Sequence, residues 1–558
     1  MSDQIPPAVN ELPPSPTPAP APKGGRGARL ALIIGIAVVL LGGAAGAAGY
    51  LFLRGAPEAV LDKVPASADV VVVAHLDPAA SQKMNLFRMA EKFPALGSRE
   101  ELTRLFNDAL DGVLSGSGLS HEDLSWVGGE AGGYVDIGLG TPTYAIMFAT
   151  DDEAAANAAM QRMRDASHAP YSTTTIDGVE VAVSGSSNQP AMAIVDGVAV
   201  FASDENAMRE VISTAGGDNS IQDDPVFAGV SDRLPEDNLG FAFVNVEQVT
   251  ELLNSIPGVL SGLPSGTEQL AAAQGVGFSV SADSDGLALD SVTTTDPAKL
   301  TQEQRDAIAS SEDPNALLDL VPADAYAVSA FGGVTAGLEQ SIEQAAQLAP
   351  REARMLERLH LIGPDGVLTH LTGDLAVQAG PATGLLPIGG SVLIGVDDAD
   401  AVRAWLDENL QGLIADANPL DLPGGFGWKT EEYNGVTITY ANALASPVPV
   451  AYGVVDGALV IATSAKGVEQ AVDLSQAGGG IVTDPGYSAA VAGMPGTESV
   501  MYIDVQGILT AVQGFLPGDA YEQFLEAGGD NLEPITAVVA GSETDESGGS
   551  SRLLIHIP

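Results

Sequence analysis

The stretch VDGVAVFAS, residues 195–203, returns later in the chain as VDGALVIAT, residues 455–463. Each copy places an Asp-Gly pair between two apolar runs, and Asp-Gly favours the positive φ angles that close a two-residue hairpin. Ser203-Asp204 and Thr463-Ser464 follow, where a helix N-terminus needs a capping side chain. The next apolar positions keep the spacing of one buried helix face: Met208, Val211 and Ile212 in one copy, Val468, Ala471 and Val472 in the other. The repeated stretch predicts a hairpin that leads into an amphipathic helix.

This hairpin is one of a series of matches that keep the same order in both parts of the chain. The matched segments include 64–74 with 321–331, 146–155 with 392–401, 176–183 with 433–440, and 241–246 with 500–505. The offset between partners drifts by a few residues, but the order never changes. Duplication followed by insertion and deletion in loops leaves this pattern, so the sequence predicts two copies of one unit.

The fold class follows from the elements within each copy. Strand and helix patterns alternate, and each copy ends in a hairpin, at 276–294 and 535–557. We therefore expect an α+β fold, in which one N-terminal transmembrane helix is followed by two tandem copies of a mainly antiparallel sheet domain covered by helices. The expected first domain is 63–299, the connecting segment is 300–318 and the second domain is 319–558. Each is long enough to bury a core of its own.

Residues 30–53, LALIIGIAVVLLGGAAGAAGYLFL, carry no charge and are long enough as a helix to cross a hydrocarbon core of about 30 Å. We interpret them as an uncleaved membrane anchor; a cleaved signal peptide is the alternative. Basic residues precede the segment, so the disordered, proline-rich tail 1–29 is expected in the cytoplasm, and everything after the linker 54–62 outside. The spacing of Gly42 and Gly46 favours a weak homodimer.

The chain has 73 acidic and 23 basic residues, a formal charge of −50. Phosphate binding needs clustered cations, so nucleic acid is excluded as a partner. The acidity fits a solvated surface of a protein kept soluble at high salt, or a cation-binding surface. Asp283-Ser-Asp285-Gly286 begins like a calcium loop but lacks the closing Glu, and a hairpin turn explains it as well. The absence of cysteine excludes disulfides, thiolate metal sites and cysteine nucleophiles.

No residue pattern points to catalysis, and we assign no catalytic, cofactor-binding or metal-binding residue. His75 interrupts a buried strand, where we expect it to pair with a carboxylate or backbone group. Asp151-Asp152 and Asp397-Asp398 stand between a strand and a helix, as capping residues do. Trp126 is expected to pack a helical region against the next strand. A hydrolase remains the alternative, if His75 or His121 meets a serine and a carboxylate in space.

Three segments in order carry a resemblance: VPASADVVVVAHLDP at 64–78, WVGGEAGGYVDIG at 126–138, and the hairpin at 195–203. They resemble the uncharacterised bacterial membrane-anchored envelope proteins of the domain of unknown function 3352 family. The second copy lacks the Leu-Asp-Pro and the Trp. The resemblance implies an exported, anchored body in a bacterial envelope and gives no catalytic or binding residues.

Together these observations predict a single-pass protein of the cell membrane with a duplicated acidic body outside. We expect a non-enzymatic role: binding a partner protein, a lipid or a wall component, or a structural role. An envelope hydrolase with a spatially assembled active site is the alternative.

Overall fold

The computed structural model describes residues 59–93, 104, 121–137, 141–186, 189–255, 271–309, 315–333, 361, 366–381, 388–410, 428–441, 450–496, 498–516 and 518–558. The predicted tail 1–29, the predicted membrane helix 30–53, and with it Gly42 and Gly46, lie outside the described residues. Within the described part of the chain, no helix is both long and apolar enough to cross a membrane.

Twenty strands form the sheet. Those of the first half are β1 (Val70–His75), β2 (Val127–Asp136), β3 (Thr143–Thr150), β4 (Tyr171–Ile176), β5 (Val179–Ser184), β6 (Ala191–Val195), β7 (Val198–Ala202), β8 (Gly240–Asn245), β9 (Ala273–Asp283) and β10 (Gly286–Thr295). Those of the second half are β11 (Ala327–Phe331), β12 (Leu371–Pro381), β13 (Ile388–Val396), β14 (Trp428–Tyr433), β15 (Val436–Ala441), β16 (Ala451–Val455), β17 (Ala458–Ala462), β18 (Ser499–Asp504), β19 (Ala537–Asp545) and β20 (Gly548–His556).

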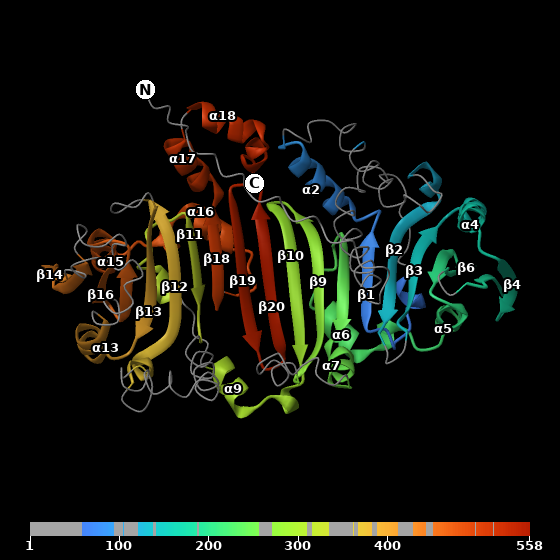
Figure 1. Ribbon diagram of the computed structural model, residues 1–558, viewed down its shortest axis with the longest axis horizontal. Coiled ribbons are helices and arrows are strands. Elements are labelled where there is room, and N and C mark those ends of the chain that lie inside the picture. The colour runs from blue at the N-terminus through green and yellow to red at the C-terminus, as the bar shows by residue number, and fades with distance from the viewer. Residues whose placement is uncertain are drawn as a thin grey trace, which may run out of the picture.

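Every pairing is antiparallel, and the strands follow one another from edge to edge of a single sheet (Figure 1). The order is β4-β5-β6-β7-β3-β2-β1-β8-β9-β10-β20-β19-β18-β11-β12-β13-β17-β16-β15-β14. The two halves have the same strand order when each is followed from its outer edge, β4 or β14, to the centre of the sheet, where β10 meets β20.

The predicted arrangement of two tandem domains is wrong, because β10 and β20 join the halves into one 20-stranded sheet. Their pairing runs from Gly286 opposite His556 to Thr294 opposite Gly548. Left alone, β10 would present a long row of unpaired backbone N–H and C=O groups, and pairing with β20 removes that exposed edge. The cores also meet: Ala288 of β10 packs in the hydrophobic cluster of the second half. The prediction of mainly antiparallel strands with helices does match the structure.

The junction has an approximate twofold symmetry. The hairpins β9–β10 and β19–β20 are 262 residues apart, from Gly286 to Gly548, and the same offset relates Asp290 to Arg552. These two equivalent residues face each other across the junction, with Arg552 Nε 2.7 Å from Asp290 Oδ1. Two identical charges would repel at this position, so the opposite charges on the two halves favour their pairing.

Helices cover both faces of the sheet. The α-helices are α2 (Ala80–Ala90), α4 (Glu153–Ser167), α5 (Glu205–Ala215), α6 (Pro225–Ser231), α7 (Val246–Ser255), α9 (Gln302–Ala309), α10 (Asn315–Leu318), α13 (Ala399–Trp405), α15 (Ala465–Ala477), α16 (Pro485–Val491), α17 (Val505–Phe515) and α18 (Gly518–Glu526). Short 3-10 turns are η1 (Leu61–Lys63), η3 (His121–Leu124), η4 (Ile221–Asp223), η5 (Pro297–Lys299), η6 (Val367–His370), η8 (Ile481–Thr483) and η9 (Gly529–Leu532), and Leu406–Leu410 continue α13 as a π-helical turn, η7.

The repeated hairpin and helix form as the sequence predicts. Asp196 and Asp456 have φ angles of 44° and 46°, as the turn requires. The Asp204 side chain accepts hydrogen bonds from the backbone of Asn206 and Ala207 at the start of α5, and Ser464 caps α15 through Gly467. All six predicted helix positions are buried: Met208, Val211, Ile212, Val468, Ala471 and Val472.

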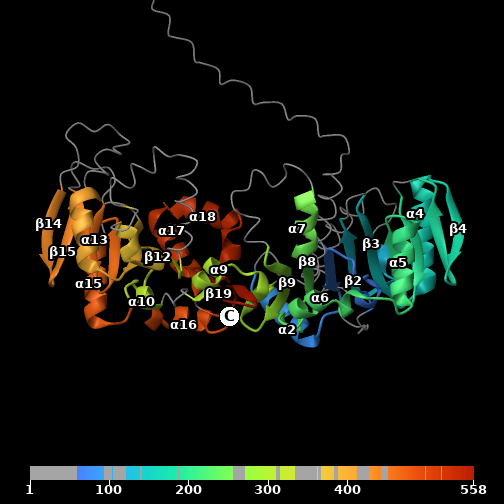
Figure 2. The ribbon, with the colours of Figure 1, turned by 90° about the horizontal axis from the view of Figure 1, so that it is seen from below.

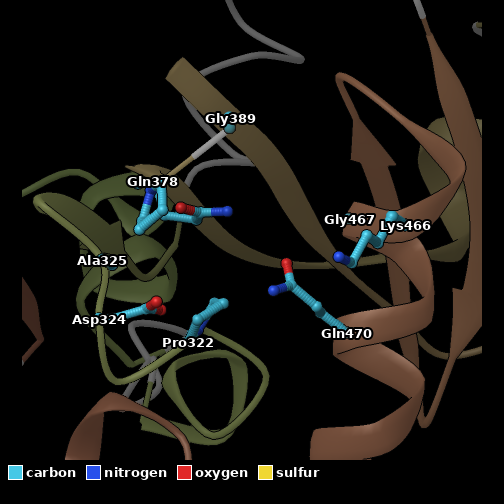
Figure 3. A pocket seen from close by; sticks show the side chains of 11 residues that line it. Pro322, Asp324, Ala325, Gln378, Gly389, Lys466, Gly467 and Gln470 are labelled. Atoms are coloured by element: carbon cyan, nitrogen blue, oxygen red, sulfur yellow. The ribbon is translucent and has the colours of Figure 1, made fainter. Parts of the chain in front are cut away.

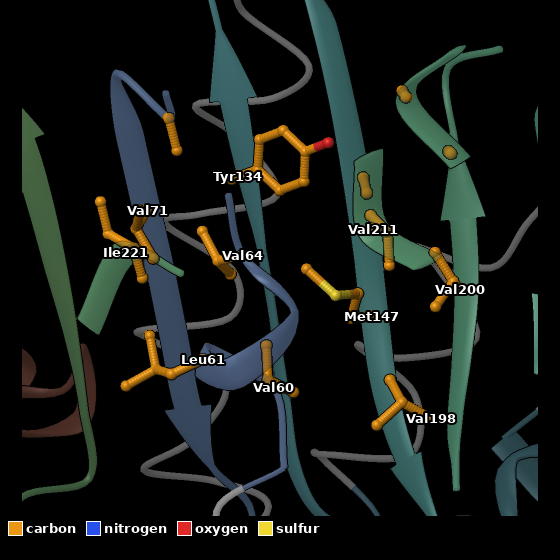
Figure 4. Packing of buried hydrophobic residues seen from close by; sticks show 14 of the residues in the cluster. Val60, Leu61, Val64, Val71, Tyr134, Met147, Val198, Val200, Val211 and Ile221 are labelled. Carbon is orange, nitrogen blue, oxygen red and sulfur yellow. The ribbon is translucent and has the colours of Figure 1, made fainter. Parts of the chain in front are cut away.

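The main cores lie on the face of the sheet beneath α5, α6, α15 and α16, which we call the covered face. In the first half, the side chains of Val71 and Met147 meet Val211 of α5 and Val64 beside η1 (Figure 4). In the second half, Val468 of α15 and Tyr487 of α16 occupy the corresponding places. On the opposite face, α4 covers one outer end of the sheet and α13 covers the other.

Candidate functional site: an open apolar sheet face

The middle of the sheet opposite the covered face carries a continuous row of side chains. The strand register places these residues side by side across eight strands, and we call them the open row: Val280, Leu289, Leu553, Ala540, Met501, Ser329, Val377 and Val392. None is charged, and one is polar. With a spacing of about 4.8 Å between neighbouring strands, the row is about 34 Å long.

Large apolar side chains are exposed on this face. Leu289 and Val377 of the open row are 42% and 41% exposed, and their neighbours Phe278 and Phe331 are 40% and 39% exposed. Ile388, at the start of β13, is 50% exposed. The other members of the open row are half-buried. Exposed apolar side chains of this kind make the open row a candidate site for an apolar partner.

The covered face of β9, β10 and β20 is polar where these three strands pair. Ser279 and Asp290, which are neighbours in the register, are 0% and 8% exposed. Arg552 lies next to Asp290 and also approaches Asp283, with its Nη1 3.5 Å from Asp283 Oδ2. Antiparallel sheets ordinarily bury their apolar face and expose their polar face. Strands β9 and β10 do the reverse at this point, whereas the covered face of β11, β18 and β19 is apolar, with Val328, Val500 and Val539 buried.

Among the described residues, helices border this face, and Met89 of α2 shares a cluster with Val280 at one end of the open row. Figure 2 shows α7 and α17 on the same side of the sheet as α13, whereas α6 and α16 lie on the opposite side. Met160 of α4 packs in a cluster with Phe201, and Val402 of α13 in a cluster with Tyr452, at the two outer ends. The exposed residues of the open row lie between these two clusters in the strand order.

The backbone N–H of His75 donates a hydrogen bond to the carbonyl oxygen of Leu239 at 2.9 Å. His75 ends β1 opposite Glu130 of β2. Glu130 is 2% exposed, and its Oε2 accepts hydrogen bonds from the backbone of Ala59 at 2.5 Å and of Val60 at 2.9 Å. The Glu130 carboxylate therefore holds the backbone of Ala59 and Val60 against β2. Nearby, Asp77 forms an ion pair with Lys83.

The predicted capping carboxylates do cap helices. Asp152 Oδ1 accepts a hydrogen bond from Ala155, and Asp398 Oδ1 accepts from Asp400 and Ala401. Asp283 and Gly286 flank the hairpin turn between β9 and β10. Among the described residues, no three His, Asp or Glu side chains lie where they could hold a metal ion.

Trp126 is buried and packs edge-on against Phe148 of β3, with ring centroids 6.0 Å apart. Its indole N–H has no hydrogen-bond partner among the described residues.

The other histidines are scattered. His121 begins η3, His168 ends α4 in the left-handed conformation, and Nδ1 of His370 lies 3.7 Å from Asp397. His556 Nδ1 is 2.6 Å from Thr536 Oγ1, and His360 lies outside the described residues. The structure brings no two of the described histidines into one site.

A small polar cavity of about 50 Å³ lies beside the N-terminus of α15. Gln378, Asp324, Lys466 and Gln470 line it, and the amide of Gln470 points into it (Figure 3). The equivalent of Gln378 in the first half is Tyr134, since each lies opposite the matching residue of β11 or β1. The cavity has room for a few water molecules, so it does not compete with the open face as a ligand site.

Acidic groups with raised pKa values gather on the covered face of the first half. Burial raises the pKa of Asp69, partly offset by a hydrogen bond from the backbone N–H of Ile137, while Asp136 adds to the rise. Burial, Asp136 and Asp204 raise the pKa of Glu210. Burial and the charge of Glu210 raise the pKa of the Tyr134 hydroxyl. These groups affect stability and lie on the face opposite the open row.

Comparison with solved structures gives three crystal forms of the protein TP0453. Crystal form III is 13% identical and covers 46% of this chain and 87% of its own, with a TM-score of 0.24. Form IV is 11% identical and covers 42% of this chain and 79% of its own, with a TM-score of 0.23. Form I is 13% identical and covers 44% of this chain and 82% of its own, also with a TM-score of 0.23. Likeness at this level supports no argument about fold or function.

No curated protein matches the chain. A family model described as "Protein of unknown function (DUF3352)" matches residues 33–412, which run from before β1 to just beyond η7. The matched segment is more than half of the 558 residues and includes the resemblance seen in the sequence. The chain therefore belongs to the DUF3352 family of proteins of unknown function.

Proposed function

We propose that this protein is a non-enzymatic envelope protein that binds the acyl chain of a lipid on its open face. The observation that carries the proposal is the uncharged open row across eight strands, together with the reversed polarity of β9 and β10 within it. Leu289 is 42% exposed, while its chain neighbour Asp290, on the other face of the same strand, is 8% exposed. Exposing apolar surface costs about 25 cal/mol per Å², and a bound acyl chain removes that surface from water.

The shape and charge of the site narrow the ligand class. A row about 34 Å long without charges suits an extended, flexible hydrocarbon better than a compact polar molecule. The chain carries a formal charge of −50, so anionic head groups are repelled. We therefore infer a zwitterionic or uncharged lipid.

Attachment to the membrane is part of the proposal. The uncharged segment 30–53 anchors the chain, and Lys23, Arg26 and Arg29 keep its N-terminal tail in the cytoplasm. The body then stands outside, near the lipids it binds. An impermeant thiol reagent applied to intact cells checks this orientation, because it should label a cysteine introduced into the body and leave one introduced at Ser15 unlabelled.

Photochemical cross-linking tests lipid binding. The full chain is placed in vesicles that contain phosphatidylcholine with a photoreactive group on its acyl chain, and mass spectrometry locates the labelled residues. We expect label on Phe278, Leu289 and Leu553. Phosphatidylglycerol with the same acyl chain should label the open row several-fold less.

A matched pair of variants provides the control. Leu289→Asp places a charge in the open row, whereas Leu532→Asp changes a leucine of similar exposure, 39%, in η9 outside the sheet. We expect Leu289→Asp to reduce labelling of Phe278 and Leu553 at least tenfold and Leu532→Asp to leave it unchanged. Equal labelling in both variants, or label spread over the whole surface, would show that the open row is not the lipid site.

A further inference from the structure

The two ends of the sheet differ in a way that points to self-association. β4 is the last strand at one end and pairs only with β5 among the described residues; β14 is the last strand at the other end and pairs only with β15. Figure 1 and Figure 2 show the two strands at opposite extremes of the molecule. They are equivalent strands of the two halves, and each is followed by a two-residue turn, Asp177-Gly178 or Asn434-Gly435.

No described strand pairs with the outer edge of β4, and its backbone groups there follow a regular pattern. In the hairpin with β5, Ile176 lies opposite Val179 across the turn, so Ile176, Thr174 and Ser172 direct their backbone groups to β5. The alternate residues Tyr171, Thr173 and Thr175 therefore direct their N–H and C=O groups outward. A second strand can pair with those groups.

The two edges differ in charge, position by position. From the second residue onward, β4 reads Ser172, Thr173, Thr174, Thr175, and β14 reads Lys429, Thr430, Glu431, Glu432. Charged side chains on an edge strand block pairing with another chain, and β14 has three of them. β4 has none, although the chain as a whole is strongly acidic. β-branched threonines also favour the extended conformation.

We propose that β4 pairs antiparallel with β4 of a second copy of this chain. The outward groups fix the register: Thr173 lies opposite Thr173 of the partner subunit, and Tyr171 lies opposite the partner's Thr175. The junction inside the chain is a precedent, because β10 and β20 are also equivalent strands paired antiparallel about an approximate twofold axis. Because β4 carries no charged side chain, it brings no charge into the new pairing, whereas β14 would bring three.

Disulfide cross-linking tests the pairing, and the absence of native cysteine makes it specific. Thr173→Cys is compared with Thr430→Cys, the equivalent exposed residue of β14, in the full chain in its membrane under mild oxidation. The Cα atoms of two paired residues in a sheet are about 4.5–5.5 Å apart, within the range of a disulfide. We expect Thr173→Cys to give at least fivefold more covalent dimer than Thr430→Cys.

Two further measurements separate this pairing from chance collision or contact through another surface. Adding Thr174→Glu and Thr175→Glu to Thr173→Cys copies the charges of Glu431 and Glu432, and should abolish most of the cross-link. The yield from Thr173→Cys should also rise with sodium chloride, because salt screens the repulsion between two acidic bodies. Equal dimer from the two cysteine positions, or dimer that survives the glutamates, would overturn the proposal. A basic and an uncharged extended peptide can each be added before oxidation of Thr173→Cys. If only the basic peptide blocks the cross-link, the edge of β4 binds a basic extended segment of another protein, and the proposed pairing of two copies is overturned.

Discussion

The two faces of the central strands are built from alternating residues of the same segments, yet they do different things. On the covered face, Phe243 is 1% exposed and packs edge-on against Phe227 of α6, with ring centroids 5.2 Å apart. On the open face, Phe278 of the neighbouring strand is 40% exposed. The covered face holds most of the buried core, and among the described residues the open face leaves Phe278 partly exposed. The difference teaches that hydrophobicity alone does not identify a core.

The largest expected effect is the difference in the free energy of unfolding between alanine variants of these two phenylalanines. Phe243→Ala removes a buried ring and leaves a cavity, which should lower the free energy of unfolding by about 4 kcal/mol. Phe278→Ala removes a ring that is already partly in water, and should cost about 1 kcal/mol through lost strand propensity. Urea unfolding of the two variants measures both values. Similar losses in the two variants would mean that the open face is part of the core.

The next effect tests the ion pair of the covered face. Arg552→Ala leaves the Asp290 carboxylate, whose side chain is 11% exposed, without its two hydrogen bonds from the guanidinium. An uncompensated buried charge should lower the free energy of unfolding by about 3 kcal/mol. The double variant Asp290→Ala with Arg552→Ala removes both charges and should lose less than Arg552→Ala alone. If the two losses simply add, Asp290 and Arg552 do not stabilise each other.

The smallest effect concerns pH. Burial raises the pKa values of Asp69 and Glu210 on the covered face. A carboxyl with a higher pKa in the folded than in the unfolded state binds its proton more tightly when folded. Its contribution to stability is therefore full below the unfolded pKa of about 4 and is lost as the pH rises through the folded pKa. We expect the melting temperature to rise as the pH falls from 7 toward 5.

The matched variants for this pH effect are Asp69→Asn and Leu289→Asn. Asp69→Asn keeps an oxygen that can accept from Ile137 and should reduce the rise in melting temperature. Leu289→Asn, on the open face, should leave the rise intact. An equal rise in Asp69→Asn and in the unmodified chain would contradict the contribution of the Asp69 carboxyl.

Local patterns predicted the local structure well. The hairpin turns at Asp196 and Asp456, the caps at Asp152 and Asp398, and the burial of Val211 were all predicted from residues within one helix or hairpin. The exposure of the open face was not predicted from such local patterns. The strand 276–283 alternates Phe278 and Val280 with Ser279 and Ser281, which indicates one apolar and one polar face. The ordinary interpretation buries Phe278, and the structure buries Ser279 and Ser281 instead.

The sequence by itself determined that this chain contains a repeated order of strands and helices, where its turns and caps lie, and which family it belongs to. The turns and caps depend on contacts between residues a few positions apart, and the repeat and the family are recognised from the order of such segments. Tertiary structure alone decided that β10 pairs with β20, so that the two halves share one sheet, and that apolar side chains such as Leu289 and Phe278 are exposed on the central strands in the described part of the chain. Both outcomes depend on which edges and faces meet after the chain has folded, between residues such as Asp290 and Arg552 that are 262 positions apart.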